Sequence, residues 1–207
     1  MATWRNWAEN QKAHPQSIES PRDVGELAAL VAEASSRGQK VKAVGSGHSF
    51  TSAAATDGRM IRLENLSGIS HVNRANNQVT VGAGTRLSEL NTLLHAEGLA
   101  LANLGDIAYQ TVAGAISTST HGTGKALTGL AGQVVAMTLV IGQGEIIECS
   151  DSSHADILDV GRVSVGALGV ISEYTLQAVP SFRLRALEQP MRLDDVLESA
   201  HELSAEH

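Results

Sequence analysis

Residues 41–50 read Val-Lys-Ala-Val-Gly-Ser-Gly-His-Ser-Phe, a short apolar run followed by a loop with two glycines. The apolar run predicts a β-strand, and glycines two positions apart let the backbone turn successive N–H groups toward one point. The two serines add hydroxyl donors around the same concavity. Such a loop is typical of an anion site, most often one for phosphate. A phosphate site needs no imidazole, so His48 inside the loop indicates a further chemical role.

The residues on either side of this loop predict a small β-α-β unit. A helix is expected from Ser20 as its N-cap, with Pro21 in the first helical position. Apolar residues at helical spacing continue to Gly38, which is placed to end the helix. A second strand is expected at residues 60–63. The glycine loop then lies at the C-terminal end of a strand, where α/β proteins commonly bind ligands.

The second half of the chain predicts a mainly antiparallel sheet with flanking helices. Two hairpins are expected, one turning at Asn76-Asn77 and one at residues 142–144. A helix with leucines on one face lies between them. The Gly-Ala-Gly at 82–84 before that helix is interpreted as a structural turn, with ligand binding as the alternative. The expected strands cover residues 69–72, 78–81, 133–141, 145–149 and 169–176.

Composition limits the class of protein. The 207 residues carry 15 Lys and Arg against 22 Asp and Glu, and the net charge of −7 argues against sequence-independent binding to nucleic acid. The single cysteine, Cys149, cannot form an internal disulfide, and no spacing of His, Cys or carboxylates indicates a metal site. The N-terminus lacks the apolar stretch of a secretory signal, and no segment is long enough to span a bilayer. A cytoplasmic location is therefore expected.

Residues 107–144 contain a single Asp, Glu, Lys or Arg, which is Lys125. Part of this stretch suits a buried sheet, but residues 111–124 are small and rich in hydroxyl groups, as in a wall that a flat ligand approaches closely. A third segment, 166–171, can offer backbone hydrogen bonds to an adenine-like edge. The glycine loops match neither the P-loop nor the dinucleotide-binding Gly-x-Gly-x-x-Gly pattern. An ATPase and a nicotinamide-binding Rossmann domain are therefore disfavoured.

The order of these segments resembles the FAD-binding domain of the vanillyl-alcohol-oxidase-type flavoproteins, known as the PCMH type. Within that superfamily the chain most resembles the sugar-lactone and alditol oxidases. The matching motifs are Gly-Ser-Gly-His-Ser-Phe at 45–50, Thr-Val-Ala-Gly at 111–114, Thr-His-Gly-Thr-Gly at 120–124 and Gly-Ala-Leu-Gly-Val-Ile at 166–171. The resemblance runs from about Trp4 to Pro180, and the motifs are specific as a set.

The resemblance implies an α+β fold in which two lobes hold FAD, a small β-α-β lobe at residues 1–66 and a larger lobe at 67–180. Residues 181–207 then begin a truncated substrate or cap domain. The resemblance also implies that His48 bonds covalently to the 8-methyl carbon of the flavin; the alternative is a loop histidine that binds a backbone carbonyl. The other cofactor-binding residues implied are Val44, Gly45, Ser46, Gly47, Ser49, Gly105, Asp106, Thr111, Gly114, Ala115, Ile116, Ser117, Thr118, His121 and Val170.

Some positions carry narrower expectations. His121 is either a polar contact near the flavin or a hydrogen-bonded loop histidine. Gly105 is compatible with access of dioxygen, because the resemblance places a small residue near the reactive edge of the flavin. Trp4 and Trp7 are expected to cover the core rather than to form a stacking site.

The implied function is FAD-dependent oxidation of a CH–OH group in a sugar lactone or polyol, with oxygen or another acceptor taking the electrons. No catalytic residue for that reaction is identified within the 207 residues. The alternative is a non-catalytic flavin-binding module, or a fragment that needs a missing cap domain or a partner over the amphipathic helix expected at 191–207. The enolpyruvyl-sugar reductase branch of the same fold is disfavoured, because it is not expected to carry the covalent histidine motif.

Overall fold

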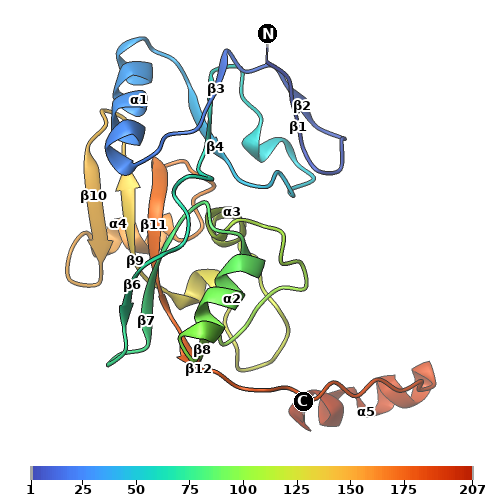
Figure 1. Ribbon diagram of the computed structural model, residues 1–207. Coiled ribbons are helices and arrows are strands. Elements are labelled where there is room, and N and C mark those ends of the chain that lie inside the picture. The colour runs from blue at the N-terminus through green and yellow to red at the C-terminus, as the bar shows by residue number, and fades with distance from the viewer. Residues whose placement is uncertain (1, 207) are drawn as a thin grey trace.

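The computed structural model (Figure 1) describes residues 2–206. Its parallel sheet contains three strands. The strand order is β3 (Ser17–Glu19), β5 (Arg59–Arg62) and β4 (Val41–Val44). The helix α1 (Val24–Ser36) connects β3 to β4, so the predicted β-α-β unit is confirmed. Because β4 ends at Val44, the glycine loop starts at the C-terminal end of a parallel strand.

The helix α1 begins later than predicted. Its N-cap is Asp23 rather than Ser20, and the Asp23 carboxylate accepts a hydrogen bond from the Glu26 backbone N–H at 2.8 Å. Ser20 instead donates its hydroxyl proton to Glu64 at 2.7 Å. Serine and aspartate cap helices about equally well, so the tertiary contact of Ser20 decides between them. Gly38 follows the helix with φ +63°, as predicted for its end.

The second sheet contains five antiparallel strands in the order β10-β9-β11-β7-β6. Both predicted hairpins are confirmed, since β6 pairs with β7 and β9 pairs with β10. Strand β11 lies between β9 and β7 and so joins the hairpins into one sheet. The strands are β6 (Ile69–Asn73), β7 (Gln78–Gly82), β9 (Val134–Val140), β10 (Ile146–Ser150) and β11 (Val170–Gln177).

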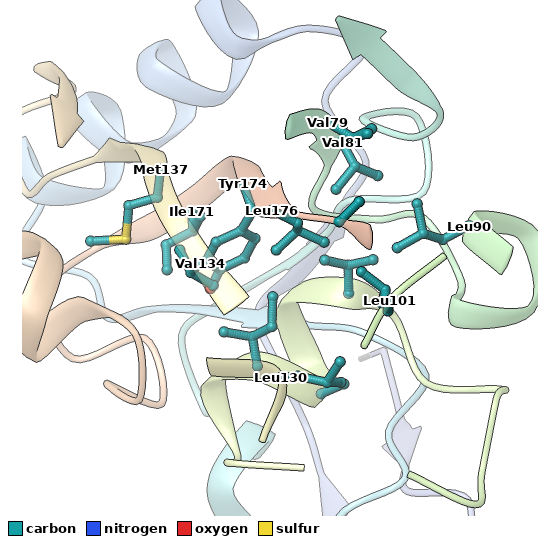
Figure 2. Packing of buried hydrophobic residues seen from close by; sticks show 14 of the residues in the cluster. Val79, Val81, Leu90, Leu101, Leu130, Val134, Met137, Ile171, Tyr174 and Leu176 are labelled. Atoms are coloured by element: carbon teal, nitrogen blue, oxygen red, sulfur yellow. The ribbon is translucent and has the colours of Figure 1, made fainter. Parts of the chain in front are cut away.

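One face of the second sheet carries the main hydrophobic core (Figure 2). Val81, Tyr174 and Met137 are partners on the adjacent strands β7, β11 and β9, and all three are buried. The helix α2 (Leu87–Ala96) adds three buried leucines at helical spacing, and burial of each stabilises the fold by about 2 kcal/mol. The short helices α3 (Val112–Ser117) and α4 (Ala155–Gly161) contribute further buried residues to this core.

A second buried cluster joins the two sheets. Leu27 and Val31 of α1 pack with Ile61 of β5 and with Val140 and Val170 of the larger sheet. Because residues of both sheets share this cluster, the sheets are held in one arrangement. That arrangement brings the end of β4, the end of β7 and the start of β11 to one cavity. The lobe boundaries near residues 66 and 180 stay predictions.

The remaining elements are short, except for the last helix. Strand β1 (Trp4–Arg5) pairs with β2 (Lys12–Ala13), and β8 (Leu99–Ala100) pairs with β12 (Val179–Pro180). Single 3-10 turns are η1 (Ser52–Ala54) and η2 (Leu130–Gln133).

After β12 the chain leaves the sheets and ends in α5 (Leu193–Glu206), which lies apart from them (Figure 1). An amphipathic helix is confirmed here, with Leu193 and Leu197 exposed, whereas His207 of the predicted range lies outside the described residues. Within residues 2–206 no helix is both long and apolar enough to cross a membrane.

Candidate functional site

A cavity of about 830 Å³ lies where the two sheets meet. Its volume falls in the upper part of the range of roughly 300–1,000 Å³ that is usual for ligand and cofactor sites. The three segments predicted to converge on one ligand, 45–50, 111–124 and 166–171, all reach this cavity. The wall is formed mainly by parts of residues 42–54, 83–86, 105–121 and 165–171.

The glycine loop after β4 carries backbone donors without partners. Among residues 2–206, the backbone N–H groups of residues 46–49 donate no hydrogen bond. Gly47 has φ +67°, a left-handed conformation that glycine adopts without steric cost. Successive N–H groups in such a loop form an anion-binding concavity. The loop therefore has the chemistry of an anion site.

The hydroxyl groups of both loop serines already make hydrogen bonds within the protein. Ser46 donates its hydroxyl proton to the Tyr109 carbonyl at 2.6 Å. The Ser49 hydroxyl lies 2.9 Å from that of Thr51 and accepts a hydrogen bond from the Thr51 N–H at 3.3 Å. Both hydroxyls therefore hold the loop in shape. The donors left for a ligand are the backbone N–H groups.

The glycine loop and the N-terminus of α3 meet at Thr111. A Cβ atom at Gly45 would lie 2.1 Å from Thr111 Oγ1, so glycine is required for this close approach. Thr111 is the N-cap of α3, and its Oγ1 accepts a hydrogen bond from the Gly114 N–H at 3.2 Å. All three residues line the cavity. The Thr111 hydroxyl therefore lies against Gly45 of the glycine loop and also caps the helix α3.

The helix α3 turns one side to the cavity and the other to the core. Ala115 and Ile116 are buried in the main hydrophobic core and are not part of the cavity wall, and the expectation that they line a cofactor stays a prediction. Residues three and four apart share one side of a helix, so a continuous run of small residues cannot face a ligand throughout. The residues on the cavity side are Ala113, Gly114, Ser117 and Thr118.

The segment before α3 brings Gly105 and Asp106 to the wall. A Cβ atom at Gly105 would lie 2.8 Å from Thr120 Cγ2, so the close approach of residue 120 explains the glycine. His121 also lines the cavity, and its Nδ1 lies 2.9 Å from the Gly122 carbonyl oxygen. His121 is thus a hydrogen-bonded loop histidine and a part of the cavity wall.

The loop before β11 forms another part of the wall, next to Val170. Val165 has φ +51° and Gly166 has φ +72°. The left-handed conformation is strained for a β-branched residue such as Val165. Lys42 of β4 donates from Nζ to the Val165 carbonyl at 2.7 Å and so ties this loop to the parallel sheet. The strand position of Lys42 does not by itself show which residues lie opposite.

The cavity wall is rich in cations although the whole chain has a net charge of −7. Four cationic and two anionic residues belong to it: Arg5, Lys42, Arg62 and Arg86, and Glu64 and Asp106. An excess of positive charge around a concave site attracts an anionic ligand. No local sequence pattern indicates this set, because its members come from separate segments of the chain.

His48 is half-buried and lines the cavity, and the Trp7 ring stacks on it. The ring centroids are 4.5 Å apart and the planes differ by 16°. Within the described part of the chain, neither His48 ring nitrogen has a hydrogen-bond partner, so the expected alternative, a bond to a backbone carbonyl, is not present. Trp7 is 62% exposed, so the expectation that it covers the core is wrong, whereas Trp4 is buried as predicted.

Burial raises the pKa of two titratable groups in the core. It raises the pKa of Tyr174 to about 12, against a smaller opposing effect of the nearby Ser117 hydroxyl. Burial also raises the pKa of the Cys149 thiol, and Asp156 adds to that rise. A thiol of raised pKa in a core is a poor nucleophile. The described residues contain no group of three His, Cys, Asp or Glu side chains placed to hold a metal ion.

Comparison with known proteins gives relatives along nearly the whole chain. L-gulonolactone oxidase of Mus musculus is 42% identical over 196 residues, which cover 95% of this chain and 44% of that protein. L-gulono-1,4-lactone dehydrogenase of Mycobacterium tuberculosis is 42% identical over 199 residues, which cover 96% of this chain and 46% of that protein. The chain therefore spans less than half the length of these curated relatives.

A solved structure shares the fold. The crystal structure of cholesterol oxidase from B. sterolicum matches with a TM-score of 0.74 at 19% identity, over 86% of this chain and 37% of that one. This likeness confirms the predicted α+β fold of the PCMH type. The unpartnered N–H groups of residues 46–49 and the cationic wall fit the diphosphate of FAD. Residues 15–150 match the model of the FAD binding domain, so the chain belongs to that family.

Proposed function

We propose that this chain is the flavin-holding part of an oxidoreductase that oxidises a CH–OH group of a sugar lactone or a polyol. The observation that carries the proposal is 42% identity, over almost the whole chain, to proteins named L-gulonolactone oxidase and L-gulono-1,4-lactone dehydrogenase. When bound, FAD supplies a two-electron acceptor for the hydride of the alcohol carbon. One relative is named an oxidase and the other a dehydrogenase, so the proposal covers oxygen and other final acceptors.

In this proposal the glycine loop binds the diphosphate of FAD. The backbone N–H groups of residues 46–49 donate to it, and the cationic wall, including Lys42, balances its charge. Gly105, which is also part of the wall, is proposed to lie beside a small acceptor such as dioxygen. The other residues proposed to touch the cofactor are Val44, Gly45, Asp106, Thr111, Gly114, Ser117, Thr118, His121 and Val170.

We further propose that His48 bonds covalently to the flavin. The support is that its half-buried ring lines the cavity next to the unpartnered N–H groups and that its nitrogens are unengaged within the described residues. A neutral imidazole nitrogen with an unengaged lone pair can attack an electrophilic carbon. The covalent bond would give His48 a chemical role in the loop beyond the binding of phosphate.

Acid precipitation of the purified protein, after its visible absorption spectrum is recorded, tests the cofactor and its bond. Flavin bands and a yellow pellet are expected, and His48→Ala is expected to move the colour to the supernatant. A yellow supernatant from the wild type would overturn the covalent bond and keep bound FAD. A colourless protein that does not take up added FAD would overturn the whole proposal.

Anaerobic bleaching of the bound flavin tests the substrate class. The protein expressed from its complete coding sequence is mixed in turn with L-gulono-1,4-lactone, D-arabinono-1,4-lactone and xylitol. Bleaching by a lactone or by the polyol is expected. Bound flavin that none of the three reduces would favour the alternative, a non-catalytic flavin-binding module. A partner or further domain over Leu193 and Leu197 of α5 stays a prediction.

A further inference from the structure

The stack of Trp7 on His48 joins the N-terminal ribbon, formed by β1, β2 and the residues between them, to the proposed flavin site. Besides the ring contact at 4.5 Å, Trp7 donates its backbone N–H to the Gly47 carbonyl at 2.8 Å. Phe50 meets the indole edge-on, with ring centroids 6.4 Å apart. His48 lines the cavity, whereas Trp7 is not part of the wall. The indole therefore packs on a ring face of the imidazole without being part of the cavity wall.

The segment that carries Trp7 is anchored to the glycine loop by side chains. Asn6 is only 3% exposed, and its Nδ2 donates to the Ser49 carbonyl at 2.9 Å. Its Oδ1 accepts a hydrogen bond from the Gln11 N–H, also at 2.9 Å. Asn10 donates from Nδ2 to the Phe50 carbonyl at 3.1 Å. A buried amide with its hydrogen bonds made is rigid, so the position of Trp7 relative to the loop is well defined.

Trp7 is placed to orient the imidazole without blocking it. The indole is 62% exposed and adds little to the core, so its aromatic contacts are with His48 and, edge-on, with Phe50. A ring stacked on one face of an imidazole resists rotation about the Cβ–Cγ bond. The nitrogen lone pair and the N–H bond of an imidazole lie in the ring plane, so both nitrogens stay accessible at the edge.

We propose that Trp7 is a positioning residue that holds the His48 ring for attachment to the flavin, and this inference rests on the covalent bond proposed above. Attachment forms a C–N bond between an imidazole nitrogen and the 8-methyl carbon. It breaks one C–H bond of that methyl group and the N–H bond of the imidazole. The two protons and two electrons pass first to the flavin and then to dioxygen, which gives hydrogen peroxide. A ring held near the attack geometry reacts faster than one that rotates freely.

The test is the rate of covalent attachment. Protein expressed under riboflavin limitation is mixed with FAD, samples are denatured at intervals, and flavin fluorescence is measured in the protein band. Trp7→Ala is expected to slow attachment about tenfold to a hundredfold. Trp7→Phe keeps a ring for stacking and is expected to restore most of the rate. Phe182→Ala removes an exposed aromatic side chain that is not part of the cavity wall and is expected to leave the rate unchanged.

A second measurement separates positioning from folding. Reversible FAD affinity, measured by flavin fluorescence in a His48→Ala background, is expected to change less than twofold on addition of Trp7→Ala. Attachment at the wild-type rate in Trp7→Ala would overturn the role of Trp7, as would an equal loss of rate and FAD affinity. If Trp7→Ala does not fold, Trp7→Phe and Trp7→Leu decide, and equal rates in these two overturn the proposal.

The wild type separates this inference from the function on which it rests. Acid-stable flavin in the wild type, with unchanged attachment in Trp7→Ala, overturns only the role of Trp7. A wild type without acid-stable flavin overturns the covalent bond and the role of Trp7 together.

Discussion

Two glycine pairs follow strands in this molecule, and they serve opposite purposes. Residues 45–48 after β4 and residues 82–85 at the end of β7 share the Gly-x-Gly spacing. In residues 82–85 each of the four backbone N–H groups donates a hydrogen bond within the protein, to the carbonyls of Gly68, Ser172, Leu66 and Gly82 respectively. In the loop after β4, by contrast, the backbone N–H groups of residues 46–49 donate no hydrogen bond among residues 2–206. One pair completes the fold, and the other leaves donors for a ligand.

The atoms packed against the glycines also differ between the two loops. A Cβ atom at Gly84 would lie 1.8 Å from the Leu63 carbonyl oxygen, and one at Gly82 would lie 2.3 Å from that of Leu66. A Cβ atom at Gly45 would instead meet the side chain of Thr111. A side chain can rotate away, whereas a backbone carbonyl moves only with the segment that holds it. Glycine at 82 and 84 is therefore a requirement of the fold, and glycine at 45 is a requirement of the site.

The largest effect is expected for Gly84→Ala. The added methyl group would overlap the Leu63 backbone, so the free energy of unfolding is expected to fall by about 3 kcal/mol. Urea unfolding followed by circular dichroism measures the change. Gly142→Ala is the matched control: no atom lies within 4 Å of its added Cβ, and its stability is expected to stay within about 0.5 kcal/mol. Equal stability of the two variants would contradict the requirement of the fold for glycine at position 84.

Gly45→Ala is expected to affect the ligand more than the fold. Displacement of Thr111 or of the loop disturbs the free donors, so FAD is expected to bind about tenfold more weakly, a change of about 1.4 kcal/mol. Fluorescence titration in a His48→Ala background keeps the binding reversible. Adding Thr111→Ala relieves the overlap, so the effects of the two substitutions on affinity are expected not to add. Additive effects would contradict a direct contact between these residues.

Thr111→Ala alone tests the helix side of the cavity. The variant loses the hydrogen bond from the Gly114 N–H to Oγ1, and the free energy of unfolding is expected to fall by about 1 kcal/mol. Thr111→Ser keeps the hydroxyl group and is expected to retain most of that stability in the same urea experiment. If serine is as damaging as alanine, the cap is not the reason for threonine here.

The smallest effect is expected for Ser46→Ala. This variant loses the hydrogen bond from Ser46 to the Tyr109 carbonyl near the surface, which is worth about 0.5–1 kcal/mol. FAD affinity is expected to change less than in Gly45→Ala, because the backbone donors remain. A larger loss of affinity in Ser46→Ala than in Gly45→Ala would mean that the serine hydroxyl, rather than the backbone, binds the ligand.

Elements with a strong local pattern could be predicted from the sequence. The hairpin at Asn76-Asn77 needs only two alternating runs and a turn residue that tolerates positive φ, and it forms as predicted. The start of α1 could not be predicted, because Ser20 and Asp23 are both good caps and a contact with Glu64 occupies Ser20. Trp7 was misjudged for a similar reason. Its aromatic side chain suits a core, but the ribbon turns it onto His48.

By itself the sequence determined the strands and helices with a strong local pattern, the glycine loop and the resemblance to flavoproteins, because these depend on neighbours along the chain. Only the tertiary structure decided which Gly-x-Gly keeps its donors free. It also decided that Ala115 and Ile116 face the core and that Lys42 and three arginines share one wall with His48. These features depend on atoms supplied by distant segments, and no local pattern records which segments pack side by side.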